Sequence, residues 1–234
     1  MNQQSTHPIN IAIDGPAGAG KSTVARHVAS RLHYIYVDTG AMYRAVTCIA
    51  LDRGMSPDDE AGVGQLAQTL DLVLLPGEDG QKVLVDGIDV AARIRSHEVN
   101  RNVSRVSAIG AVRTRMADLQ RRMAQAKGVV MDGRDIGTHV LPDAELKIFL
   151  TASPRERALR RYRELGDGAG ATLDQLERDI AERDRMDRER DIAPLIQAPD
   201  ARLIDSTGRS IEDIVDEIVD GGLAAARTIS AGET

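Results

Sequence analysis

The hydrophobic positions near the start of the chain follow two spacings, which predict a mixed α/β protein. Residues 9–13 alternate between isoleucine and smaller or polar side chains, as in a strand, and a glycine-rich turn follows at Gly15. From Lys21 the apolar residues recur every three or four positions, as in a helix, and residues 34–37 form a second apolar run. The chain therefore opens as strand, loop, helix and strand.

Further along, the same spacings predict more helices and strands. Apolar runs bounded by turn residues at 129–131 and 146–150 are typical of strands buried on both faces of a parallel sheet. A last strand is expected at 202–204. Helices are expected over 41–53, 112–126 and 211–223, and also after three residues suited to capping a helix, namely Ser56, Ser153 and Thr172.

The stretch from Asp71 to Val90 has a different pattern. Residues 72–75 and 82–85 flank a Pro- and Gly-containing segment at 76–80, as two strands flank a hairpin loop. An antiparallel piece inside an α/β chain predicts an insertion. We therefore expect a core over 1–65 and 106–227, an inserted lobe over 66–105 and a disordered tail over 228–234.

Composition narrows the class of protein. A chain of 234 residues can bury a sizeable core, as one domain with an insertion or as two small domains. A net charge of −6, no tryptophan and one phenylalanine do not fit a surface for long nucleic acid. No apolar run is long enough to span a membrane. The single cysteine, Cys48, rules out an internal disulfide, and residues 1–10 lack a leader pattern, so we expect a cytoplasmic protein.

A phosphate-binding loop follows the first strand. The sequence fits the pattern G-x-x-x-x-G-K-[ST] between a strand and a helix, where backbone N–H groups and the helix N-terminus can surround an anion. We expect Lys21 to reach the β- and γ-phosphates of ATP and the Ser22 hydroxyl to ligate Mg²⁺. The predicted ATP-binding residues are Gly15, Pro16, Ala17, Gly18, Ala19, Gly20, Lys21, Ser22 and Thr23.

Charged residues that could bind a second phosphate follow two other strands. Arg44 comes shortly after the second strand, where ligands bind in open α/β folds, and Thr39 could cap the helix that contains it. Residues 132–135 place two carboxylates and an arginine directly after a buried strand. A solvated arginine and a structural ion-pair turn are the simpler explanations of these two features.

Arginine and acidic residues alternate over 155–191 in nearly equal numbers, which does not favour binding of nucleic acid. Glycines at 166–170 separate two arginine-rich helices, which we expect to form a movable lid over about 160–190. On a continuous helix, Arg183, Asp187 and Arg190 would share a face, so that Asp187 could orient both arginines. Surface helices often carry such ion pairs without any ligand.

Together these segments resemble the bacterial cytidylate kinases. The similarity rests on GPAGAGKS at 15–22, DTGAMYR at 38–44, DGRD-x-G-T at 132–138 and ERDRMDRERDIAPL at 182–195, and it extends over about 10–219. It implies a P-loop NTPase core with a parallel sheet flanked by helices, an inserted monophosphate-binding lobe and a lid. The reaction implied is transfer of a phosphoryl group from ATP, with Mg²⁺, to CMP or dCMP.

The resemblance also implies roles for individual residues. The residues implied to hold the CMP phosphate are Arg44, Arg134 and Arg190. Those at the ribose and the transferring group are Arg183 and Asp187. Those that read the cytosine are Ser104, Arg113 and Asp135. Those lining the acceptor pocket are Thr39 and Tyr43. On the lid, Arg160 is implied to contact ATP, with Arg161 a weaker candidate. The implied catalytic residues are Lys21, Arg134, Arg183, Asp187 and Arg190.

Other functions are compatible with the phosphate-binding loop alone. One is a P-loop kinase for another small acceptor, such as a different nucleotide or a hydroxy acid. Another is a nucleotide switch, although the sequence contains no guanine-reading N-K-x-D motif. The expected partners are ATP and CMP or dCMP, without a nucleic-acid polymer or a membrane, and the expected state is a monomer.

Overall fold

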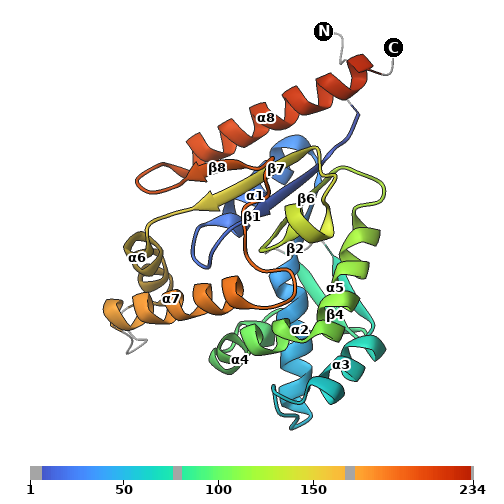
Figure 1. Ribbon diagram of the computed structural model, residues 1–234, viewed down its shortest axis with the longest axis vertical. Coiled ribbons are helices and arrows are strands. Elements are labelled where there is room, and N and C mark those ends of the chain that lie inside the picture. Colours follow the sequence, from blue (N-terminus) through green and yellow to red (C-terminus); the bar gives the residue numbers. More distant parts are fainter. Residues whose placement is uncertain (1–6, 76–80, 167–171, 233–234) are drawn as a thin grey trace. The chain divides into compact units, whose positions relative to one another are not determined.

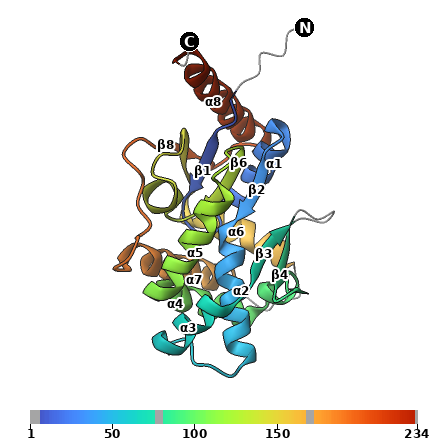
Figure 2. The ribbon, with the colours of Figure 1, turned by 90° about the vertical axis from the view of Figure 1, so that its right-hand side faces the viewer.

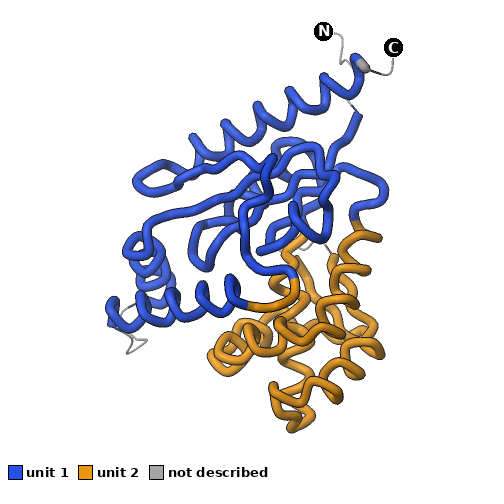
Figure 3. Tube along the Cα trace, viewed as in Figure 1, with its two compact units in different colours: residues 1–36, 124–189, 193–234 blue, residues 37–123, 190–192 orange. Residues whose placement is uncertain are grey.

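The computed structural model describes residues 7–75, 81–166 and 172–232. They divide into two compact units, coloured in Figure 3. Unit 1 comprises residues 1–36, 124–189 and 193–234, and unit 2 comprises residues 37–123 and 190–192. The chain first leaves unit 1 inside the strand β2 (Ile35–Asp38).

Unit 1 is built on the predicted parallel sheet, whose strand order is β2-β6-β1-β7-β8. Its other four strands are β1 (Asn10–Asp14), β6 (Val129–Gly133), β7 (Leu146–Thr151) and β8 (Arg202–Asp205). β1 pairs in parallel with β6 and β7, and β7 pairs in parallel with β8. In this register Asp14 lies opposite Gly133, so the segments that follow β1 and β6 leave the sheet at the same edge.

Two helices cover one face of this sheet. α1 (Lys21–Leu32) and α8 (Ile211–Gly232) lie side by side (Figure 1 and Figure 2) and share a core with the isoleucines of β1. α8 continues through most of the tail that we expected to be disordered. Ile229 packs against the core, and the Ser230 hydroxyl donates to the carbonyl of Ala226. Of the expected tail, only residues 233–234 lie outside the described residues.

Two further helices of unit 1 pack against each other. α6 (Pro154–Leu165) and α7 (Leu173–Glu189) pack through Ala158, Leu176 and Ile180. Residues 167–171, which hold most of the glycine-rich tip expected at 166–170, lie outside the described residues. Since α7 ends at Glu189, Arg190 is not on it, and the prediction that Arg183, Asp187 and Arg190 share one helix face is wrong.

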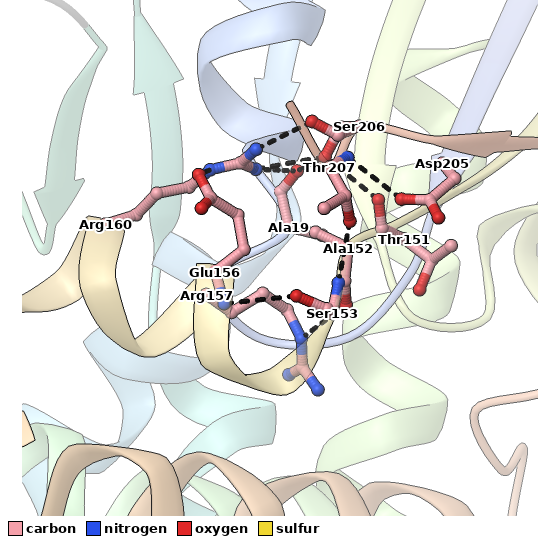
Figure 4. A network of polar contacts seen from close by, with 10 residues as sticks. All are labelled: Ala19, Thr151, Ala152, Ser153, Glu156, Arg157, Arg160, Asp205, Ser206 and Thr207. Carbon is pink, nitrogen blue, oxygen red and sulfur yellow. Dashed lines mark hydrogen bonds and ion pairs between the residues drawn. The ribbon is translucent and has the colours of Figure 1, made fainter. Parts of the chain in front are cut away.

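The predicted caps of these two helices are present. The Ser153 hydroxyl accepts from the N–H of Glu156, and the Thr172 hydroxyl accepts from the N–H of Gln175. The carboxylate of Glu156 does not complete a capping box, because it pairs with Arg160 one turn further along α6. The N–H of Ser153 donates instead to the Thr207 hydroxyl, as Figure 4 shows.

Unit 2 combines helices with a three-stranded antiparallel sheet of order β3-β4-β5. Its helices are α2 (Thr39–Asp52), α3 (Glu60–Thr69), α4 (His97–Ala108) and α5 (Gly110–Met123), with a short 3₁₀ turn, η1 (Arg93–Arg95). Its strands are β3 (Leu72–Leu75), β4 (Lys82–Val85) and β5 (Ile88–Asp89). The strands predicted at 72–75 and 82–85 are confirmed as an antiparallel pair, and the expected loop at 76–80 lies outside the described residues.

Two predicted caps in unit 2 are wrong. Asp59, not Ser56, caps α3 by accepting from the N–H of Gly62. Asp38, not Thr39, caps α2 by accepting from the N–H of Ala41. In both cases a carboxylate takes the cap, and it is also favoured by the partial positive charge of the helix N-terminus.

Unit 2 contains the insertion expected at 66–105 and extends beyond it on both sides. The reason is a shared core: Val46 of α2, Val83 of β4 and Val112 of α5 are all buried in one hydrophobic cluster. The helices on either side of the hairpin therefore fold with it. Among the residues that the structure describes, none of the helices combines the length and the apolar character needed to cross a bilayer.

Candidate active site

The phosphate-binding loop predicted from the sequence, residues 15–22, joins β1 to α1 and is called the cradle below. Gly15 has φ +150°, and a Cβ there would collide with the carbonyl oxygen of Leu150 in the neighbouring strand β7. Gly20, at φ +89°, is the N-cap of α1. Because the first N–H groups of a helix have no partner within it, the cradle and the start of α1 form an anion site with a partial positive charge.

Lys21 is buried among charged side chains of both signs. It is 5% exposed, and its Nζ donates to the carbonyl of Pro16 at 2.8 Å. Burial lowers the pKa of Lys21 to about 7, helped by the charges of Arg134 and Arg183 and opposed by those of Asp132 and Asp14. Three cations of unit 1 thus gather at the cradle. A bound polyanion would stabilise their charged forms.

A hydroxyl and a carboxylate meet next to Lys21. The Ser22 Oγ donates to Oδ2 of Asp132 at 2.9 Å, and the Tyr36 hydroxyl donates to Oδ1 of the same carboxylate at 2.9 Å. Mg²⁺ is usually bound by one or two carboxylates together with substrate phosphates and water, and this pair of oxygen groups fits that pattern. No cluster of three acidic, histidine or cysteine side chains suited to a metal occurs among the described residues.

Arg134 lies beside α7. Its Nε donates to Oδ2 of Asp187 at 2.8 Å, and its Nη1 donates to the carbonyl of Gly133. Although burial acts in the opposite direction, Asp187 raises the pKa of Arg134. Asp187 therefore orients an arginine of the turn after β6, whereas the sequence predicted that it would orient Arg183 and Arg190. Arg183 is half-buried on α7, while Arg190 belongs to unit 2.

The turn after β6 is tied to the residue before the cradle. Asp14 accepts hydrogen bonds from the N–H groups of Ile136 and Gly137, at 2.8 and 2.7 Å. Burial raises the pKa of Asp14 to about 6, although these two bonds act in the opposite direction. They fix the start of a π-helical turn, η2 (Ile136–Val140), directly after Asp135, which is itself 4% exposed.

Arg160, expected to contact ATP, lies at the cradle but is held by protein groups. Its Nη1 donates to the carbonyl of Ala19 and to the Ser206 hydroxyl, and its Nη2 donates to the Ser206 carbonyl at 2.8 Å (Figure 4). The weaker candidate, Arg161, is half-buried and pairs with Glu164. Thr23, the last predicted ATP-binding residue, is half-buried in the first turn of α1.

Unit 2 holds some of the predicted acceptor residues, and their contacts form two groups. On α2, Arg44 donates to both carboxylate oxygens of Asp38, at 3.3 and 3.0 Å. The guanidinium carbon of Arg113 lies 5.6 Å from the centre of the Tyr43 ring, within cation–π range.

The second of these groups is anchored to α4. Arg113 is 2% exposed and donates to the carbonyl of Ser107, whose hydroxyl in turn donates to the carbonyl of Ser104 one turn earlier. Ser104 is half-buried, and Thr39, at the start of α2, is buried. Hydrogen bonds and the cation–π contact thus link Tyr43, Arg113 and the α4 segment that contains Ser104 within one unit.

A comparison with known families decides the classification. The family profile described as "Cytidylate kinase" matches residues 11–222, nearly the whole chain. The chain belongs to the cytidylate kinase family. This match covers the cradle, the turn after β6 and the α7 segment, and therefore confirms the family predicted from their motifs.

Individual members of the cytidylate kinase family are similar over the same length. The chain is 50% identical to the cytidylate kinase of Shouchella clausii (strain KSM-K16) over 212 residues, which are 90% of this chain and 94% of that protein. It is 53% identical to the cytidylate kinase of Geobacillus kaustophilus (strain HTA426) over 213 residues, 91% and 95% of the two chains.

Solved structures show the same fold at low identity. A gluconokinase from Sinorhizobium meliloti 1021 is 14% identical and superposes with a TM-score of 0.50 over 97% of this chain and 99% of its own. An uncharacterised protein from Eubacterium ventriosum ATCC 27560, also 14% identical, gives a TM-score of 0.51 over 91% and 96%. These likenesses bear on the α/β kinase fold alone.

Several residues of the site were not predicted. Asp132 was expected only as part of a charged turn, although an acidic residue at the end of a buried strand beside a P-loop is itself a signal for a magnesium ligand. Asp14 and Tyr36 gave no such signal. Their partners are far away in the sequence, and only the fold brings them together.

Proposed function

We propose that the chain transfers the γ-phosphoryl group of ATP to CMP or dCMP, giving ADP and CDP or dCDP. An oxygen of the acceptor phosphate forms a bond to the γ-phosphorus, and the bond between that phosphorus and the oxygen bridging to the β-phosphate breaks. The observation that supports this most directly is the group of cations at the cradle, Lys21, Arg134 and Arg183, whose mutual repulsion a polyphosphate would relieve.

The donor residues are those of unit 1. The cradle N–H groups would bind the phosphates of ATP, and Lys21 would exchange its bond to the Pro16 carbonyl for one to a phosphate oxygen. Ser22 and Asp132 would hold Mg²⁺, which neutralises charge on the phosphates when it is bound. We further propose that Arg160 and Thr23 border the ATP site.

The acceptor residues are proposed from the family motifs, supported by the contacts within each unit. For the CMP phosphate they are Arg44, Arg134 and Arg190, and for the ribose and transferring group they are Arg183 and Asp187. For the cytosine they are Ser104, Arg113 and Asp135, with Thr39 and Tyr43 lining the pocket. The ion pairs of Asp38 with Arg44 and of Asp187 with Arg134 would orient two of these guanidinium groups before the ligand arrives.

Catalysis then depends on position and charge. Phosphoryl transfer has a loose transition state with charge spread over oxygens, so the protein has little covalent chemistry to perform. The arginines and Lys21 would stabilise that charge. Asp135 would accept a hydrogen bond from the cytosine amino group, an interaction that uracil cannot make because it carries an acceptor at that position.

Transfer of label tests this proposal. Incubating the protein with Mg²⁺, CMP and ATP labelled at the γ-phosphate should give labelled CDP. Lys21→Ala and Arg190→Ala should lower kcat by about 100-fold or more while leaving the protein folded. Arg185→Ala is the control, because Arg185 is an exposed arginine of α7 that pairs with Glu182 and Glu189 of the same helix. Near-normal turnover in either test variant would contradict the assigned roles.

A further inference from the structure

Helices α6 and α7 hold the cradle through a buried ion pair that the sequence did not indicate. Arg157 of α6 and Asp184 of α7 lie 2.7 Å apart, and their side chains are 4% and 2% exposed. Both also bind Ala17 in the cradle. Nη1 of Arg157 donates to the Ala17 carbonyl at 2.9 Å, and Oδ1 of Asp184 accepts from the Ala17 N–H at 3.2 Å.

Other contacts fix this arrangement on α6. Nε of Arg157 donates to the carbonyl of Ala152, just before the helix, as Figure 4 shows. The backbone of Gly18 lies directly against Arg157, since a Cβ at Gly18 would come within 3.1 Å of the Arg157 Cβ. The carbonyl of Ala19 is bound in a similar way by Arg160 and by the Ser206 hydroxyl. Two carbonyl groups of the cradle are thus bound by arginines of the same helix.

This arrangement determines where the cradle N–H groups point. The carbonyl of Ala17 and the N–H of Gly18 belong to one planar trans peptide, and they point in opposite directions. The same holds for the carbonyl of Ala19 and the N–H of Gly20. When α6 binds the two carbonyl groups, the N–H groups of Gly18 and Gly20 are turned away from α6. Those N–H groups are then available to an anion.

We propose that Arg157 and Asp184 are positioning residues that hold the cradle in its phosphate-binding conformation. Neither needs to touch the nucleotide, since each acts through the backbone of Ala17. The inference rests on the proposed function only in taking the cradle as the ATP site. It predicts that loss of the pair weakens ATP binding and leaves CMP binding unchanged.

The pair can be removed without leaving a buried charge. Replacing a buried ion pair by apolar residues of similar size is often neutral or stabilising, whereas removing one partner alone is destabilising. In the double variant R157M/D184L, the Ala17 peptide groups lose their partners but both helices keep apolar contacts. We expect a Tm within a few degrees of the wild-type value, a KM for ATP raised about tenfold or more, and a KM for CMP within about twofold.

A second ion pair between the same helices is the matched control. Arg155 and Asp174 lie 3.0 Å apart, and their side chains are 53% and 74% exposed. Arg155 also pairs with Glu177, which is on α7 as well. The double variant R155A/D174A should leave both KM values and the Tm unchanged. Binding of ADP and of inorganic triphosphate, measured by calorimetry, should weaken in R157M/D184L and stay unchanged in R155A/D174A.

A single substitution covers the case in which R157M/D184L does not fold. R157K keeps the positive charge but cannot reach Ala152, Ala17 and Asp184 at once, so the KM for ATP should still rise by about threefold or more. An unchanged KM for ATP in a folded variant would overturn the inference, and so would an equal rise for ATP and CMP. If the wild-type protein itself forms no CDP, the proposed function fails, while calorimetry with triphosphate still tests Arg157 and Asp184.

Discussion

The Ser22 hydroxyl donates a hydrogen bond of 2.9 Å to the carboxylate of Asp132. Ser22 lies in the first turn of α1 and Asp132 near the end of β6, more than a hundred residues further along the chain. They meet because β6 pairs in parallel with β1, so that β6 ends beside the loop that leads into α1. Tyr36 binds the other carboxylate oxygen and fixes its orientation. This pair of oxygen groups is the proposed magnesium site.

Replacing Asp132 by Asn should remove the negative charge while keeping the size of the side chain. We expect kcat to fall by about 100-fold and the Mg²⁺ concentration for half-maximal activity to rise, because one charged ligand of the cation is lost. Steady-state rates at varied free Mg²⁺ measure both quantities. Tyr36→Phe is the milder comparison, since it leaves the Ser22 contact in place. An Asn variant with the wild-type Mg²⁺ dependence would exclude Asp132 as a ligand.

Lys21 should take up a proton when ATP binds. Its pKa is lowered from 10.5 to about 7 in the free protein, so at about pH 8 most molecules carry a neutral lysine. A phosphate beside Lys21 favours the charged form and raises the pKa again. ATP binding near pH 8 should therefore be coupled to uptake of up to about 0.9 proton, whereas near pH 6 the lysine is already charged and uptake should be small.

Calorimetry in buffers of different ionisation enthalpy measures this uptake. The observed binding enthalpy near pH 8 should depend on the buffer, and Lys21→Met should remove most of that dependence. A binding enthalpy that is the same in all buffers at that pH would show that Lys21 does not change its protonation state on binding.

Gly15 should tolerate no side chain. Alanine at this position would place its Cβ against the carbonyl oxygen of Leu150, a backbone atom of the central sheet, so we expect a loss of about 3 kcal/mol or more in unfolding free energy. Gly208 is the control in the same unit, because it also has a positive φ, +69°, but a Cβ added there would meet no atom within 4 Å. Gly208→Ala should lower the unfolding free energy by only about 1 kcal/mol.

Denaturant titrations of the two glycine variants provide the comparison. Equal losses of stability in Gly15→Ala and Gly208→Ala would mean that the contact with Leu150 does not constrain the cradle.

Features set by neighbouring residues could be predicted from the sequence. The cradle, the strands of the parallel sheet and the pair β3 and β4 all follow from local spacing, from turn residues and from a motif. The caps at Ser153 and Thr172 were also predicted correctly. The caps at Asp38 and Asp59 were not, because two or more polar residues near each helix start could serve and the backbone geometry selects one of them.

Features that depend on distant contacts could not be predicted. The pair of Arg157 and Asp184 resembles any other ion pair of a charged helix until α6 and α7 are placed against Ala17. Arg190 was assigned to a helix face because the local sequence does not place the end of α7 at Glu189: Pro194 would allow the helix to continue past Arg190. The extent of unit 2 follows from a core shared by α2, β4 and α5, whose packing is not contained in any one segment.

Rates with a panel of acceptors test the central claim most directly. With Mg²⁺ and ATP, ADP release should be measured for CMP, dCMP, UMP, AMP and a hydroxy acid such as gluconate. We predict that kcat/KM for CMP or dCMP exceeds that for each of the other acceptors by about 100-fold or more, because the proposed role of Asp135, a buried carboxylate, is to accept a hydrogen bond from the cytosine amino group. Equal use of CMP and UMP, a preference for a hydroxy acid, or ADP release that no acceptor stimulates would contradict the account.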